Sequence, residues 1–139
     1  MKNYTDAHYT ELLREHSLKA TPQRIAITDL LYAYGHISID QLYEKMLEKF
    51  NSISLATIYK NIHLMLENSF VQEVKVPHAK SVFELTKEAH SHLVCSECGT
   101  IEDISIDLTE ISKRAESSST FEIHSAAVVF DGICSNCKK

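Results

Sequence analysis

Four cysteines form the most specific chemical pattern in this sequence. Cys95 and Cys98 make one CxxC pair, Cys134 and Cys137 make another, and 35 residues lie between the pairs. Each short CxxC turn brings two thiolates to the same side of an ion, and two such turns complete the closed tetrahedral shell of structural zinc. The alternative is a redox-active dithiol, but a redox motif would not need a second pair. The pattern therefore predicts Zn²⁺ joining two distant ends of one small domain.

Histidines and carboxylates near the first cysteine pair suggest a second metal site. His90 and His92 are two residues apart, so on a strand both imidazoles point to the same side. Glu84 and Asp103 offer carboxylates nearby in the sequence, and His36 could come from the N-terminal half. Such a mixed nitrogen and oxygen shell suits Fe²⁺, Mn²⁺ or Zn²⁺ better than copper(I). Taken alone, however, an HxH pattern more often belongs to two exposed histidines on a polar strand.

Composition and charge narrow the class of protein. The chain has 139 residues, 44% of them hydrophobic and 24% charged, which is typical of an ordered globular protein. No segment approaches the ~18 apolar residues that a membrane span needs, and the first ten residues contain no signal-like apolar run. We therefore expect a cytoplasmic protein without a membrane partner, in which reduced thiols bind metal rather than form disulfides.

The charge distribution decides where nucleic acid could bind. The net charge is -5, which by itself argues against a nucleic-acid partner. Residues 1–80 carry nine basic and nine acidic side chains, whereas residues 81–139 carry five basic and ten acidic ones. The excess of acid thus lies in the C-terminal part, and we expect any DNA contact in the N-terminal half.

The elements needed to position these residues form two groups. Helix-type periodicity and capping residues predict helices over 5–16, 22–34, 38–50 and 54–68, with Thr21, Ser38 and Ser54 as N-caps. A hairpin follows over 70–76 and 81–86, which together with the helices predicts a winged-helix domain. Strands over 91–95, 100–106 and 121–130, with a helix over 108–117, predict a small α/β module. We therefore expect an α+β protein with domains at 1–86 and 87–139.

The helix before the hairpin is the element that enters the major groove in winged-helix proteins. Apolar residues including Leu55, Ile58 and Ile62 are expected on its inner face. Its candidate DNA-contacting residues are Thr57, Tyr59, Lys60 and Asn61, which we expect on the exposed face. Lys19 and Arg24 flank the start of the second helix and could add backbone or minor-groove contacts. On spacing alone, a solvated face of a core helix explains the pattern equally well.

The order of these motifs resembles the ferric uptake regulator (Fur) family. The resemblance rests on LKATPQR at 18–24, SLATIYKNI at 54–62, HSHLVCSECG at 90–99 and CSNC at 134–137. It implies a homodimeric, metal-dependent repressor that binds a double-stranded DNA operator, with the four cysteines holding structural zinc. It also implies a sensing site between the two domains, base contact by Tyr59 and minor-groove contact by Lys19. The residues that match the sensing ligands are His36, Glu84, His90, His92 and Asp103.

One ligand position separates the branches of that family. An aspartate at the position of Asp103 resembles the peroxide-responsive (PerR) branch, in which H₂O₂ is the signal and regulatory Fe²⁺ or Mn²⁺ is bound. Glu84 departs from that branch, which often has aspartate there. The alternative is an iron- or zinc-responsive repressor that acts by reversible metal occupancy. We expect no enzyme, because no candidate nucleophile or phosphate-binding loop accompanies the metal ligands.

Overall fold

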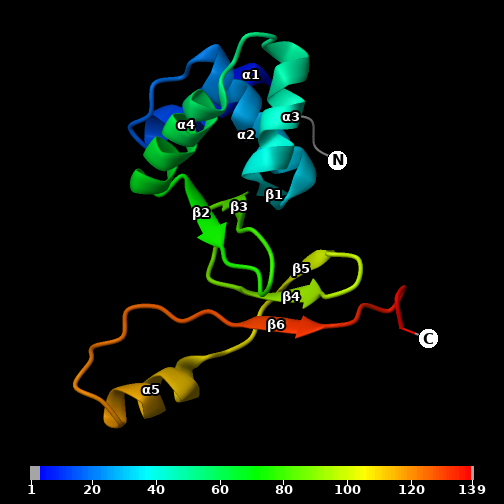
Figure 1. Ribbon diagram of the computed structural model, residues 1–139. Coiled ribbons are helices and arrows are strands. Elements are labelled where there is room, and N and C mark those ends of the chain that lie inside the picture. The colour runs from blue at the N-terminus through cyan, green and yellow to red at the C-terminus, as the bar shows by residue number, and fades with distance from the viewer. Residues whose placement is uncertain (1–3, 139) are drawn as a thin grey trace. The chain divides into compact units, whose positions relative to one another are not determined.

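The computed structural model describes residues 4–138 and has an α+β fold. The chain separates into two compact units, one ending at Thr86 and the other beginning at Lys87 (Figure 1). Among the described residues, no helix is long and apolar enough to cross a membrane.

The helices of the first unit begin where the sequence supplies side-chain caps. They are α1 (Asp6–Glu15), α2 (Pro22–Tyr34), α3 (Ile39–Lys49) and α4 (Leu55–Glu67). Thr21 accepts a hydrogen bond from the Arg24 backbone, and Pro22 occupies the first helical turn. Ser38 and Gln41 form a reciprocal capping box. The predicted helices are therefore confirmed, with ends that differ by a residue or two.

Apolar stripes on these helices meet in one core. Alternation of buried and exposed positions on α4 gives a stripe at Ile58, Ile62 and Met65, as helical spacing requires. Leu55 was predicted on this inner face but is 38% exposed, because it lies in the first turn, before the helix reaches the core. The fully buried core members are Leu13, Ile27, Leu31, Ile37, Leu42, Met46, Ile58 and Met65.

A small antiparallel sheet closes the first unit. Its strands are β1 (Ile37–Ser38), β2 (Val71–Val74) and β3 (Val82–Leu85), in the order β1-β3-β2. The hairpin of β2 and β3 agrees with the alternating pattern, whereas β1 was not predicted because two residues carry no readable period. Helices followed by this hairpin form the winged-helix arrangement, with α4 directly before the wing (Figure 1).

The second unit is built on the sheet order β5-β4-β6. Strand β4 (Ser91–Cys95) pairs antiparallel with β5 (Ile101–Ile104) and parallel with β6 (Val129–Gly132), and α5 (Thr109–Ser117) lies between β5 and β6 in sequence. The predicted strand over 121–130 is wrong for most of its length, since β6 begins only at Val129. The segment before it has no strand partner among the described residues.

Candidate metal centres and DNA-contacting face

The four cysteines converge at one end of the second unit. Cys95 ends β4, and Cys134 follows β6, which lies beside β4 with Cys95 opposite Gly132. Gly99 closes the first turn with φ +78, a conformation that favours glycine, and its N–H donates to the Cys95 carbonyl at 2.9 Å. The sulfurs of all four cysteines lie within 4.8 Å of one another, and none is in a disulfide.

This cluster has the size and polarity of a zinc site. The Sγ atoms of Cys98 and Cys134 are 3.7 Å apart, and a tetrahedral ion with Zn–S bonds of ~2.3 Å requires sulfurs about 3.8 Å apart. The pKa of Cys95 is lowered to about 6, because backbone N–H groups of Cys98 and Cys134 donate to its sulfur. The pKa of Cys137 is raised to about 12 by hydrogen bonding with the Cys134 sulfur. A doubly charged cation would stabilise all four thiolates together.

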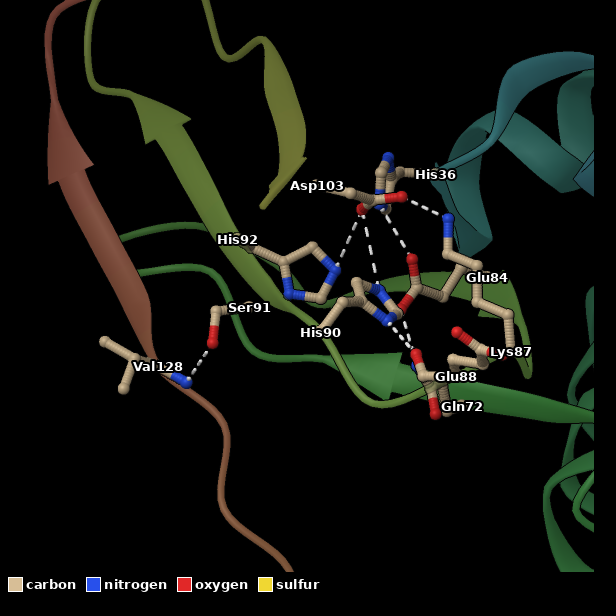
Figure 2. Close-up of polar contacts among 10 residues, drawn as sticks. All are labelled: His36, Gln72, Glu84, Lys87, Glu88, His90, Ser91, His92, Asp103 and Val128. Atoms are coloured by element: carbon tan, nitrogen blue, oxygen red, sulfur yellow. Dashed lines mark hydrogen bonds and ion pairs between the residues drawn. The ribbon is translucent and has the colours of Figure 1, made fainter. Parts of the chain in front are cut away.

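His36 and Glu84 form one part of the histidine and carboxylate set, within the first unit. His36 directly precedes β1, and the antiparallel register that pairs Ile37 with Phe83 places it opposite Glu84. His36 Nε2 lies 2.8 Å from Glu84 Oε2, and Gln72 Nε2 donates to Glu84 Oε1 at 2.6 Å (Figure 2). Glu84 is 1% exposed. Gln72 was missed by sequence reasoning, although its place opposite Glu84 follows from the hairpin register.

His90, His92 and Asp103 form the other part, within the second unit. Asp103 faces His92 across the β4–β5 pair, and its Oδ1 lies 3.3 Å from His92 Nε2 and 3.6 Å from His90 Nε2. The two imidazole rings are 4.6 Å apart, so they do point to the same side as predicted. Lys87 Nζ contacts Asp103 Oδ2 (Figure 2). Sequence reasoning also missed Lys87, for which no spacing signal exists.

The donor chemistry of both parts fits a hard or borderline divalent ion. Each part sets imidazole nitrogen beside carboxylate oxygen, the ligand mixture that Fe²⁺, Mn²⁺ and Zn²⁺ accept. His90 Nδ1 lies 2.8 Å from the Glu88 carbonyl oxygen. A carbonyl can only accept, which assigns the proton to Nδ1 and the lone pair to Nε2. The backbone carbonyl of Glu88 therefore orients His90 as a nitrogen ligand.

Only some of the candidate DNA-contacting residues are exposed. Tyr59 is 54% exposed, and Lys60 and Lys19 are exposed as well. Asn61 was predicted on the exposed face, and this is wrong: it is 8% exposed, because it falls on the buried stripe of α4 three residues after Ile58. Thr57 is half-buried beside the Ser54 cap, and its hydroxyl lies 2.9 Å from Ser54 Oγ.

Arg24 is held by the protein itself. Its Nε donates to Asn61 Oδ1 and its Nη1 donates to the Lys19 carbonyl, both at 3.0 Å. The amide nitrogen of Asn61, Nδ2, donates to the Thr57 carbonyl at 3.0 Å. Arg24 thus connects α2, α4 and the segment that carries Lys19.

Comparison with known proteins gives one consistent result. Residues 15–131 match the ferric uptake regulator family. The chain is 31% identical to the peroxide-responsive repressor PerR of Staphylococcus epidermidis, over 91% of this chain and 86% of that protein. It is also 31% identical to the peroxide operon regulator of Bacillus subtilis, over 93% of this chain and 90% of that protein.

A solved structure supports the same assignment at the level of the fold. The Campylobacter jejuni peroxide stress regulator is 35% identical to this chain and superposes with a TM-score of 0.71, covering 91% of this chain and 97% of that one. Because the family match spans most of the chain and the relatives cover it almost completely, the protein belongs to the ferric uptake regulator family.

Proposed function

We propose that this protein is a cytoplasmic, homodimeric repressor that binds a palindromic operator while metal is bound and releases it when peroxide oxidises the metal site. One observation carries the peroxide branch of this proposal. Asp103 is an aspartate that faces His92 and His90, in a chain whose curated relatives include peroxide-responsive repressors. Those relatives are named as regulators, and we propose no enzymatic activity.

The regulatory ion would be held by ligands from both units. His36 and Glu84 would supply one side of its shell, and His90, His92 and Asp103 the other. Within each unit the donors are already arranged beside one another, so little side-chain entropy is lost on binding. Fe²⁺ or Mn²⁺ in this shell would select the arrangement of the two units that fits the operator. By reciprocity, the operator would tighten metal binding by the same factor.

Peroxide sensing would use the same ligands as its target. Fe²⁺, when bound, would supply the one-electron chemistry that opens the O–O bond of H₂O₂. In the net reaction one peroxide oxygen would replace the hydrogen of a C–H bond on a neighbouring imidazole, which is oxidised by two electrons, and that hydrogen would leave with the other oxygen as water. His36 and His90 are the proposed acceptors of that oxygen. An oxidised ring is a poorer nitrogen ligand, so the site would lose its metal and the two units would no longer be joined.

The first unit is the proposed DNA-binding domain. Tyr59 and Lys60 on α4 would read and contact the major groove, with Thr57 at the start of the helix, and Lys19 would reach the minor groove. A dimer would present two copies of α4, so the operator should consist of two inverted half-sites.

The second unit is the proposed dimerisation domain, stapled by Zn²⁺. Its large apolar residues are mostly outside, with Phe121 75% exposed, Ile133 54% exposed and Phe130 44% exposed. Strand-type alternation over 121–128 without strand structure is a further reason to expect a partner there. A second copy of this chain is the proposed partner that covers these residues.

The test compares two metals under peroxide. The Fe²⁺-loaded protein should gain one oxygen on His36 or His90 at low H₂O₂, seen by peptide mass spectrometry, and lose operator binding in parallel. The Mn²⁺-loaded protein should remain unmodified and bound. Asp103→Glu, which keeps the charge but lengthens the side chain, should keep metal-dependent binding while oxidation slows. If the Fe²⁺ protein stays intact on DNA under peroxide, the iron- or zinc-responsive alternative replaces the peroxide proposal.

A further inference from the structure

Arg24 lies where two candidate DNA-contacting segments meet, and its guanidinium donates a hydrogen bond to each of them. Its Nε donates to Asn61 Oδ1 on α4, and its Nη1 donates to the backbone carbonyl of Lys19. Its own backbone is fixed as well, because its N–H donates to Thr21 Oγ1 and its carbonyl accepts from Thr28 Oγ1 at 2.7 Å. The Arg24 backbone, from which the guanidinium extends, is therefore held in place in the first turns of α2.

Asn61 is the α4 end of this connection. It is 8% exposed, and both ends of its amide are used, Oδ1 by Arg24 and Nδ2 by the Thr57 carbonyl. A buried amide with these fixed partners cannot rotate without losing a hydrogen bond. Asn61 is two residues after Tyr59 and one after Lys60, so fixing Asn61 fixes the stretch of helix that carries both exposed side chains.

The Lys19 carbonyl is the other end. It accepts from Arg24 Nη1 at 3.0 Å and from the Thr21 N–H at 3.1 Å. These two bonds hold the short segment between α1 and α2, which has no helix or strand of its own. The exposed Lys19 side chain projects from the residue whose carbonyl is held.

We propose that Arg24 is a positioning residue that sets the distance between Lys19 and Tyr59, rather than a phosphate-contacting residue. This inference rests on the proposed DNA-binding function. One planar guanidinium with donors in fixed directions joins two acceptors that belong to different segments. DNA that is contacted in two grooves at once demands a fixed spacing between the contacting groups, so the connection serves discrimination between sequences more than attraction to phosphate.

Arg24→Lys separates the positioning role from a phosphate contact, because it keeps the positive charge but removes the planar guanidinium that joins the two acceptors. With the metal-loaded dimer, the ratio of operator to random-DNA affinity should fall roughly tenfold, the size expected for a lost hydrogen bond to a charged group. The slope of log affinity against log salt on random DNA should remain unchanged. A phosphate contact predicts the reverse: Arg24→Lys would keep the ratio, and Arg24→Met would lower the slope by about 0.9 while weakening both DNAs equally.

Asn61→Leu provides an independent arm, since a buried neutral residue makes no phosphate contact of its own. It should reproduce the loss of ratio seen for Arg24→Lys, and the double variant should be no worse than either single one. Additive losses would overturn the proposal. Arg14→Met, which removes an exposed positive charge on α1, is the matched control for charge. Unfolding midpoint and zinc content are measured first; if Asn61→Leu does not fold, Arg24→Lys alone decides.

A measurement without DNA separates failure of this inference from failure of the proposed function. In the DNA-free protein the Arg24 Nε–H should exchange slowly with solvent by NMR, and Asn61→Leu should accelerate it by at least an order of magnitude. Fast exchange in the wild type would remove the connection itself. Slow exchange in a protein that binds no operator with any metal would instead refute the DNA-binding proposal.

Discussion

His36 faces Glu84 across the β1–β3 pair, with its Nε2 2.8 Å from Glu84 Oε2, and Gln72 holds the other carboxylate oxygen. Strands β2 and β3 and the residue directly before β1 thus contribute one residue each to a row that crosses the sheet of the first unit. His36 and Glu84, the two proposed metal ligands, are neighbours in this row. Gln72 lies on the other side of Glu84, and its amide orients the Glu84 carboxylate.

Gln72→Ala should therefore weaken metal binding although Gln72 is not a proposed ligand. Partners that orient a ligand typically contribute 10- to 100-fold to affinity, so we expect a loss of about tenfold. Competition of the purified protein with a fluorescent chelator for Mn²⁺ measures it. Glu73→Ala, at the exposed neighbouring position of β2, should leave Mn²⁺ affinity unchanged; equal losses in both variants would contradict the role of Gln72.

Structural zinc should remain bound through mild chelation at about one ion per chain. Four thiolates bind zinc with ~10–16 kcal/mol of apparent free energy that is coupled to folding. Cys134→Ser should unfold the second unit and abolish the dimer, as seen by zinc analysis and analytical ultracentrifugation. A folded, dimeric Cys134→Ser protein without zinc would refute the assignment of this cluster.

Tyr59 and Lys19 should fail in different ways when truncated. Tyr59→Ala should lower discrimination between operator and random DNA by about tenfold, because base contacts carry sequence information. Lys19→Ala should weaken binding to both DNAs and reduce the salt slope by about 0.9 if its main contact is to phosphate. Binding titrations at several salt concentrations distinguish the two. Parallel losses on both DNAs for Tyr59→Ala would count against base contact.

The Tyr9 hydroxyl donates to Asp29 Oδ1 at 2.9 Å and joins α1 to α2. Burial, together with that hydrogen bond and the charge of Asp29, raises the pKa of Tyr9 to about 12. Because the folded state favours the protonated form of Tyr9, this interaction contributes its full stability below pH 10, the ordinary pKa of tyrosine. That contribution is lost as the pH rises from 10 towards 12.

Tyr9→Phe should accordingly lower the free energy of unfolding by about 1 kcal/mol near pH 8, with a smaller difference from wild type above pH 10. Urea unfolding followed by far-ultraviolet circular dichroism reports on the helices concerned. A difference that stays constant from pH 8 to pH 11 would show that the ionisation of Tyr9 is not linked to folding.

Helix positions in the first unit were predictable because local chemistry decides them. Thr21, Ser38 and Ser54 satisfy backbone N–H groups wherever the chain turns into a helix, and this needs no knowledge of the rest of the fold. Exposure on α4 was less predictable. A polar residue such as Asn61 is expected at the surface. Its burial is favourable because Arg24, on α2, donates a hydrogen bond to its side-chain oxygen.

In the second unit, local sequence pattern was a poor guide to strand formation. The alternating pattern over 121–130 predicted a strand, yet the backbone joins the sheet only near its end, where Val128 donates to Ser91 Oγ and accepts from the His92 N–H. Strand formation depends on an available edge, which periodicity does not reveal. The convergence of the four cysteines was easier to predict than the extent of β6, because the spacing within each CxxC pair is a local property.

The parallel pairing of β4 with β6 has a consequence for how the chain folds after synthesis. The first unit is dominated by helices that contact their sequence neighbours, so it should fold early. The second must close a loop that contains all of β5 and α5 before β6 can dock, which costs ~3 kcal/mol in chain entropy. Few apolar side chains of that unit are buried to offset this cost. Zinc supply should therefore set how long newly made chains remain open to proteolysis, and through that the number of repressor molecules in the cell.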